Sequence, residues 1–306
     1  MEFGLHLPSA APGVTAGPIL ETARAAEDLG YDAVWMFDHL FTPVGIESQY
    51  PYSRDGGYPM SPDDPFFDPL GLFGVLAGAT QRVKMGTGVL IPTYRHPIVL
   101  GKLLATIENF APGRILLGAG AGWMREEFDA VGVPYQRRGA RLEEYIAALR
   151  AVWSGSPASF DGELYSWTEA GFLPAPTAPI PVIIGGHSDR ALDRAARIGD
   201  GWAIATTRGQ GRGLAGVTSR LDYLRTRLEA HGRNGDHFEL VYQSALWFSD
   251  QPNEKLPLTG PPDAIAASLT QLQELGVSMV DLAVFGPAQL IVETAERFQK
   301  EVLPLV

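Results

Sequence analysis

The sequence predicts an α/β fold in which eight parallel strands, each followed by a helix, close into a (β/α)8 TIM barrel. Short apolar runs alternate with helical patterns along all 306 residues, and strands that alternate with helices indicate a parallel sheet. Eight such units match the usual size of this barrel. The strands are almost continuously apolar, as expected where helices cover their outer faces. An open doubly wound sheet is the alternative, but a single domain of that kind usually has fewer strands.

The expected strands and helices alternate along the chain, except that two helices follow the fourth strand. In the first helix, Ile19, Ala23, Ala26 and Leu29 share one face, and Gly30 ends it. The strands are expected at 2–7, 32–38, 83–91, 115–122, 181–186, 201–205, 238–248 and 278–285. The helices are expected at 17–29, 68–80, 97–110, 124–131, 138–153, 189–198, 216–231, 261–275 and 287–301.

Two long segments interrupt this alternation. Residues 42–67, after the second strand, are rich in Pro, Gly, Asp and Tyr; residues 156–180 follow the fourth strand and its helices. The stretch SFDGELYSW in the second segment suggests a small hairpin. Loops of this length usually form lids or interface elements. No low-complexity linker divides the chain, so we expect one domain over residues 1–306.

The composition excludes several classes of function. A formal net charge of −11 argues against nucleic acid or an anionic membrane surface as a partner. The absence of cysteine rules out disulfides, thiolate nucleophiles and Cys-ligated metals. No signal-peptide pattern and no run of 18 apolar residues is present. We therefore expect a cytoplasmic protein that acts on a small molecule.

In such barrels the working groups lie at the carboxyl ends of the strands. The second strand ends at Asp38 and His39, two side chains suited to handling protons. A structural clasp on the following loop is the alternative role for this pair. His6 lies at the neighbouring rim, but no metal-binding spacing joins it to the pair, so we expect no metal.

Glycines at the rim suggest a phosphate-bearing, planar ligand. Gly185 and Gly186 lie between a strand and a helix that Ser188 is expected to cap, where backbone N–H groups and the helix dipole attract anions. The hydroxyls of Thr206 and Thr207 are candidates for further donors. A tight turn explains the glycine pair equally well. The glycines of GAGAG, residues 118–122, do not match the dinucleotide fingerprint and are also consistent with close packing.

Over nearly its whole length the chain resembles the luciferase-like monooxygenase superfamily, and within it the oxidoreductases that use the deazaflavin coenzyme F420. The resemblance is carried by EFGLHLP, AEDLGYDAVWMFDH, FFDPLGLFGVLAGAT, VKMGTGVLIPTYRHPIVLGKLLATIENFAPGRILLGAGAGWMREEFDAVGVP, RRGARLEEYIAALRAVW and PVIIGGHSDRALDRAARIGDGW. It implies a bacterial luciferase-like barrel with insertions after strands 2 and 4. Because relatives are commonly dimers, it also implies a homodimer.

The resemblance implies roles for individual residues. Asp38 is expected to hydrogen-bond the deazaflavin ring, and His39 to face the reacting carbon and the substrate. Gly88 and Val89 match a third-strand bulge with a non-proline cis peptide that backs the ring, and Gly185 and Gly186 match the phosphate site. The residues expected to line the coenzyme site are Asp38, Thr87, Gly88, Val89, Gly120, Ala121, Gly185, Gly186, His187, Thr206 and Thr207.

Two positions depart from the relative that oxidises glucose 6-phosphate. Its tryptophan after the D-H pair and its glutamate in the fourth-strand loop match Val44 and Ala121 here. These differences argue against a sugar-phosphate substrate. The aromatic residues of the 42–67 loop suggest an aromatic-lined pocket or, equally, packing of the loop onto the barrel; they are Tyr50, Tyr52, Tyr58, Phe66 and Phe67.

The function expected from the resemblance is hydride transfer between coenzyme F420 and a small organic substrate. One alternative is an FMN-dependent monooxygenase of the same superfamily. A second is a barrel that binds a flavin or deazaflavin without catalysis. The Asp38–His39 pair and the long 42–67 loop argue against the second alternative.

Overall fold

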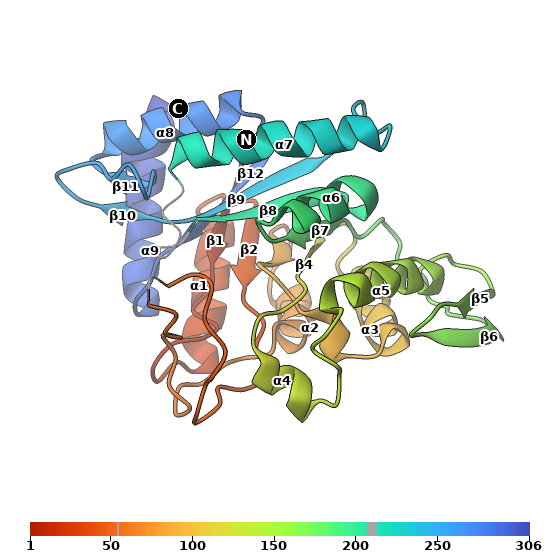
Figure 1. Ribbon diagram of the computed structural model, residues 1–306. Coiled ribbons are helices and arrows are strands. Elements are labelled where there is room, and N and C mark those ends of the chain that lie inside the picture. Colours follow the sequence, from red (N-terminus) through yellow and green to blue (C-terminus); the bar gives the residue numbers. More distant parts are fainter. Residues whose placement is uncertain (54, 207–212) are drawn as a thin grey trace.

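Eight parallel strands close into a barrel in the spatial order β1-β12-β9-β8-β7-β4-β3-β2 in the computed structural model, which describes residues 1–53, 55–206 and 213–306 (Figure 1). This confirms the predicted (β/α)8 architecture. The barrel strands are β1 (Glu2–His6), β2 (Ala33–Met36), β3 (Lys84–Thr87), β4 (Ile115–Ala119), β7 (Val182–Gly185), β8 (Gly201–Thr206), β9 (Glu239–Ala245) and β12 (Met279–Ala283).

Helices follow the strands as the apolar periodicity predicts. The α-helices are α1 (Ala16–Asp28), α2 (Pro69–Ala79), α3 (Pro97–Phe110), α4 (Arg125–Ala130), α5 (Arg138–Val152), α6 (Asp189–Ile198), α7 (Leu214–Ala230), α8 (Pro262–Glu274) and α9 (Ala288–Arg297). The 3-10 helices η1 (Pro92–Tyr94) and η3 (Leu303–Leu305) and the π-helix η2 (Phe298–Val302) complete the set. Ser188 caps α6 as expected, its side chain accepting a hydrogen bond from the Ala191 N–H.

The indole ring of Trp35 fills part of the barrel interior. Trp35 is 1% exposed, and a Cβ on either Gly4 or Gly86 would collide with its ring. Glycine on the two strands that flank β2 therefore makes room for the tryptophan. The residues that pack in this layer are Ala33, Trp35, Leu116, Ile183, Val241 and Met279.

The third strand is shorter than the predicted run 83–91. Regular pairing ends at Thr87, and pairing with β4 resumes in an isolated bridge between Leu90 and Ala119. Between these points the Gly88–Val89 peptide is cis, which confirms the predicted geometry of this bond. The interruption is the bulge that glycine inside an apolar strand indicates.

The seventh predicted strand, 238–248, divides into two. β9 stays in the barrel, whereas β10 (Trp247–Phe248) leaves it and pairs with β11 (Thr259–Gly260). Apolar periodicity runs through both and does not mark the break. The predicted hairpin is confirmed: β5 (Ala158–Asp161) and β6 (Ser166–Ala170) pair antiparallel and project from the barrel beside α5 (Figure 1).

Candidate active site

A buried glutamate holds His39 at the end of β2. The Nδ1 atom of His39 lies 2.9 Å from the Oε2 atom of Glu127, whose side chain is 0% exposed. Glu127 also accepts hydrogen bonds from the Tyr94 hydroxyl at 2.9 Å and from the Leu40 N–H at 2.6 Å. A carboxylate on Nδ1 favours the Nδ1–H tautomer, which leaves Nε2 as an acceptor. His39 is therefore oriented for proton transfer through Nε2.

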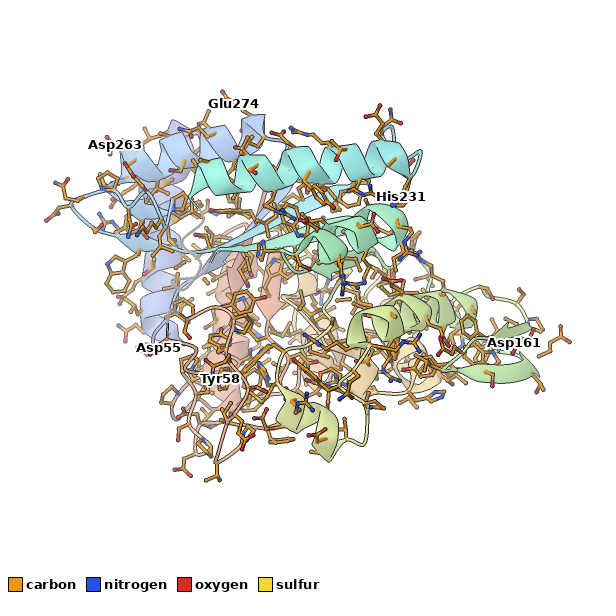
Figure 2. All side chains as sticks on the ribbon, in the orientation of Figure 1. Asp55, Tyr58, Asp161, His231, Asp263 and Glu274 are labelled. Carbon is orange, nitrogen blue, oxygen red and sulfur yellow. The ribbon has the colours of Figure 1, made fainter. Side chains whose placement is uncertain are left out.

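Aromatic rings surround His39. Its imidazole lies 5.2 Å from the Tyr58 ring, 5.4 Å from Phe66 and 5.7 Å from Trp123, measured between ring centroids. Tyr50 packs on both Tyr58 and Trp123. Figure 2 shows Tyr58 on the loop that lies beside α4. These contacts support the packing role considered for the rings; an aromatic-lined substrate pocket stays a prediction.

A carboxylate on α4 tethers the same loop. The Oε1 atom of Glu126 accepts hydrogen bonds from the N–H groups of Glu47 at 2.7 Å and Ser48 at 3.0 Å. The Ser48 hydroxyl accepts one from the Arg125 N–H at 2.9 Å. Together with Asp129 and Gly45, these residues line a cavity of about 390 Å³ on the outside of the tether. α4 therefore positions both the histidine and the loop that covers it.

Asp38 lies in a network of its own. Its side chain is 0% exposed; Oδ1 and Oδ2 each accept a hydrogen bond from the Arg95 guanidinium at 3.0 Å, and Oδ2 accepts one from the Ile91 N–H at 2.8 Å. Arg95 also pairs with Asp68 at 2.7 Å. Burial lowers the pKa of Arg95, but the two carboxylates outweigh this effect and raise it above its usual value. Asp38 thus clasps the segment after β3, and its hydrogen bond to a coenzyme ring stays a prediction.

Close packing around the bulge explains three rim glycines. A Cβ on Gly120 would lie 2.5 Å from Val89, and a Cβ on Gly185 would lie 2.8 Å from it. A Cβ on Gly118 would collide with the Thr87 carbonyl oxygen. The hydroxyl of Thr87 donates to the Gly118 carbonyl at 2.8 Å and ties the bulge to β4. These glycines therefore let Val89 sit against bare backbone, with Ala121 following next to it on the rim.

The start of α6 combines a cap with a nearby cation. Gly186 has φ +114°, a conformation that favours glycine, so the backbone of the turn is enough to explain a glycine at this position. Arg220 on α7 donates to Asp189 at 2.7 Å, and its buried Nε has no hydrogen-bond partner within the described part of the chain. The His187 ring contacts Trp202 at 5.8 Å. Thr206 is the last residue of β8, and Thr207 lies outside the described residues.

Sequence reasoning missed the four side chains that organise this rim: Tyr94, Arg95, Trp123 and Glu127. The glutamate of the glucose-6-phosphate relative was matched to Ala121, and the carboxylate that contacts His39 here is a different one, Glu127 of α4. Glu127 shares a helix face with Met124, three residues before it, and Val131, four residues after it; a glutamate on that apolar face is the signal that could have identified it. Val44, by contrast, is 95% exposed and lines no wall around His39.

Two further features are absent from the described part of the chain. Within residues 1–53, 55–206 and 213–306, no group of three or more His, Asp or Glu side chains is placed to hold a metal ion. In the same residues, no helix is both long and apolar enough to cross a membrane.

Sequence comparison gives one family match and several relatives. The family model described as luciferase-like monooxygenase matches residues 1–256. An uncharacterized protein of Mycobacterium tuberculosis (strain ATCC 25618 / H37Rv) is 36% identical over 180 residues, 59% of this chain. An F420-dependent glucose-6-phosphate dehydrogenase of Nakamurella multipartita is 34% identical over 234 residues, 75% of this chain. The matched regions span less than two thirds of these relatives, 62% and 63% of their lengths.

Solved structures match the whole chain. A monooxygenase from Streptomyces bottropensis superposes with a TM-score of 0.78 at 20% identity, covering 99% of both chains. An F420-dependent secondary alcohol dehydrogenase, solved with an F420–acetone adduct, superposes with a TM-score of 0.74 at 17% identity, covering 100% of this chain and 98% of the other. At sequence identities of 20% and 17%, these two matches show similarity of fold alone.

Proposed function

Because the chain belongs to the luciferase-like monooxygenase family, we propose that it is an oxidoreductase that uses coenzyme F420 to move a hydride to or from a small organic substrate. The observation that carries this proposal is the His39–Glu127 pair at the carboxyl end of β2, enclosed by aromatic rings. The F420-dependent relatives named above support the choice of coenzyme. FMN is the alternative coenzyme, and a barrel that binds either one without catalysis is the second alternative.

His39 performs the proton transfer in this proposal. When a hydroxyl substrate loses a hydride, its O–H proton passes to the Nε2 atom of His39; in the opposite direction Nε2 returns a proton to the forming alkoxide. Glu127 accepts the Nδ1–H hydrogen bond throughout and stabilises the imidazolium. Bound F420 supplies a ring carbon that gives or takes the hydride.

The aromatic wall excludes water from this step. Burial, helped by nearby Tyr52, raises the pKa of Tyr50 to about 12, and burial also raises the pKa of Tyr58 well above its usual value. Both phenols are therefore neutral at working pH. A substrate beside His39 meets uncharged, mostly apolar surfaces, which favours a small apolar alcohol or ketone over a sugar phosphate.

The coenzyme site in the proposal runs from the bulge to α6. Val89, which packs against the bare backbone of Gly120 and Gly185, would support a flat ring. The capped start of α6 and the unpartnered Nε of Arg220 fit an anionic phosphate. These residues would hold the ring and the phosphate, with Gly88 and Val89 behind the ring and Gly186 at the phosphate.

Coenzyme titration followed by turnover tests the proposal. Protein stripped of cofactor is titrated with F420 and with FMN, and binding is followed by fluorescence. We expect stoichiometric F420 binding, with FMN at least ten times weaker. A panel of small secondary alcohols and ketones is then scored by loss or gain of F420 absorbance, with His39→Gln as the matched control.

Two outcomes would contradict the proposal. Preferential FMN binding with oxygen consumption would assign the protein to the monooxygenases. Tight F420 binding without turnover across alcohols, ketones and unsaturated carbonyl compounds, in wild type and His39→Gln alike, would assign it to the non-catalytic barrels.

A further inference from the structure

Three buried polar side chains form a layer inside the barrel, which we call the polar floor: His6 of β1, Gln243 of β9 and Asp281 of β12. They are 5%, 8% and 1% exposed. The Oδ2 atom of Asp281 lies 3.1 Å from His6 Nδ1 and accepts a hydrogen bond from Gln243 Nε2 at 2.7 Å. Phe37 packs on the His6 ring at 3.9 Å. The polar floor is thus a connected group that the proposed mechanism does not use.

The polar floor closes the barrel directly beneath the bulge. In the closed strand order, β9 lies opposite β3. A Cβ on Gly88 would nevertheless lie 3.1 Å from Gln243 Nε2 and 3.7 Å from Asp281 Oδ2. Gln243 therefore reaches across the interior to the bulge. A ligand backed by Gly88 and Val89 rests on this layer.

Two atoms of the polar floor have no hydrogen-bond partner among the described residues: His6 Nε2 and Asp281 Oδ1. The layer below holds the apolar cluster around Trp35, whose indole N–H also has no hydrogen-bond partner in the described part of the chain. Buried polar atoms in native proteins almost always have partners, and an exception calls for a ligand or an ordered water. One carboxylate oxygen and one imidazole nitrogen, on two side chains in contact with each other, are therefore left for a ligand at the level where the ring is proposed to sit.

We propose that the polar floor recognises the imide edge of a pyrimidinedione ring, deepening the proposed function on which it rests. Asp281 Oδ1 accepts a hydrogen bond from the ring N–H. His6 pairs with Asp281 through Nδ1 and donates from Nε2 to the neighbouring ring carbonyl. Gln243 holds Asp281 in position. Deazaflavins and flavins both carry this edge, so the floor selects the ring class and leaves the choice between F420 and FMN to other residues.

A pair of probes that differ at one atom tests this assignment. Lumiflavin carries the ring N–H, and 3-methyllumiflavin replaces its hydrogen with a methyl group. Wild-type protein is expected to bind lumiflavin about tenfold more tightly than the methylated probe, the equivalent of one hydrogen bond to a charged acceptor. Asp281→Asn is expected to bind both probes with the same, weakened affinity.

Glu108→Gln is the matched control. Glu108 is also a fully buried carboxylate that accepts a hydrogen bond, from the Gly113 N–H at 2.6 Å, but it lies near the end of α3, at the opposite end of the barrel. This variant should keep the tenfold preference for lumiflavin. Thermal unfolding of both variants shows whether either has lost its fold; if Asp281→Asn has, Gln243→Leu, which removes the support of Asp281, is expected to reduce the preference in its place.

The outcomes separate this proposal from the proposed function. Equal binding of the two probes by wild type, or an unchanged preference in folded Asp281→Asn, overturns the polar-floor assignment whatever the coenzyme. Preferential binding of FMN overturns F420 dependence while the probe preference still stands. If lumiflavin, FMN and F420 all fail to bind to wild type, both proposals fall.

Discussion

Replacing Glu127 with glutamine should reverse the tautomer of His39. In the wild type, the Oε1 atom of Glu127 accepts from the Leu40 N–H, and Oε2 faces His39 Nδ1 and the Tyr94 hydroxyl. A glutamine of the same shape must keep its oxygen toward Leu40, because that backbone N–H can only donate. Its NH2 group then faces Nδ1, which becomes an acceptor, and the ring proton moves to Nε2.

The structure sets the size of the effect. The side chain stays fully buried and similar in volume, so no cavity forms. Three hydrogen bonds change from a charged to a neutral partner, which destabilises the fold by about 1–3 kcal/mol in total. With its proton on Nε2, His39 can no longer accept from the substrate, so turnover should fall by about 10²–10⁴-fold. F420 affinity should change little, because the hydrogen bonds of Glu127 go to His39, Leu40 and Tyr94 and not to the proposed coenzyme site.

Nitrogen-15 NMR of the imidazoles measures the tautomer without any substrate. The chain has six histidines, and a His39→Gln spectrum assigns the signal. We expect a protonated Nδ1 in the wild type and a protonated Nε2 in Glu127→Gln. The reasoning is refuted if Glu127→Gln keeps the wild-type tautomer and full turnover. Glu126→Gln, one residue earlier on α4, is the control that should leave the His39 signal unchanged.

Three further predictions follow from the same geometry. His39→Ala should leave F420 affinity within about threefold of wild type while turnover falls by about 10²–10⁴-fold; normal turnover would assign the residue to the loop clasp. Gly185→Ala should destabilise the protein by about 1–3 kcal/mol and weaken F420 binding, because the new Cβ would lie 2.8 Å from Val89. The control Gly171→Ala, with open space around the new Cβ, should do neither. Equal melting temperatures of the two variants by calorimetry would contradict this prediction. Partial burial raises the pKa of Glu126, but hydrogen bonds from the 47–48 segment outweigh it and the net pKa is lowered from 4.5. The tether is therefore intact above pH 4.5 and lost as the pH falls through the lowered value, so hydrogen exchange at residues 47–48 should accelerate, beyond its intrinsic pH dependence, only below pH 4.5.

Local patterns in the sequence predicted much of this molecule. Alternation of apolar strands with amphipathic helices predicts the barrel, because each βαβ unit requires a parallel neighbour. The residues next to Ser188 are enough to predict that it caps a helix, and the stretch SFDGELYSW predicts a hairpin. The cis peptide at Gly88–Val89 was expected from the family resemblance, and the D-H pair at the end of β2 was expected at the rim from strand position alone.

The tertiary structure brings together the side chains, far apart in the sequence, that complete each site. Glu127 reaches His39 across 88 residues of sequence, Arg95 reaches Asp38 across 57, and Asp281 reaches His6 across 275. No periodicity encodes such pairings, because they depend on the order in which the barrel closes and on the direction of side chains at its rim. The approximate positions of the barrel strands, their carboxyl ends and the candidate histidine could therefore be predicted from the sequence alone. Only the folded chain decided that Asp38 binds an arginine, that His39 is oriented by a buried glutamate, and that a polar layer lies beneath the bulge.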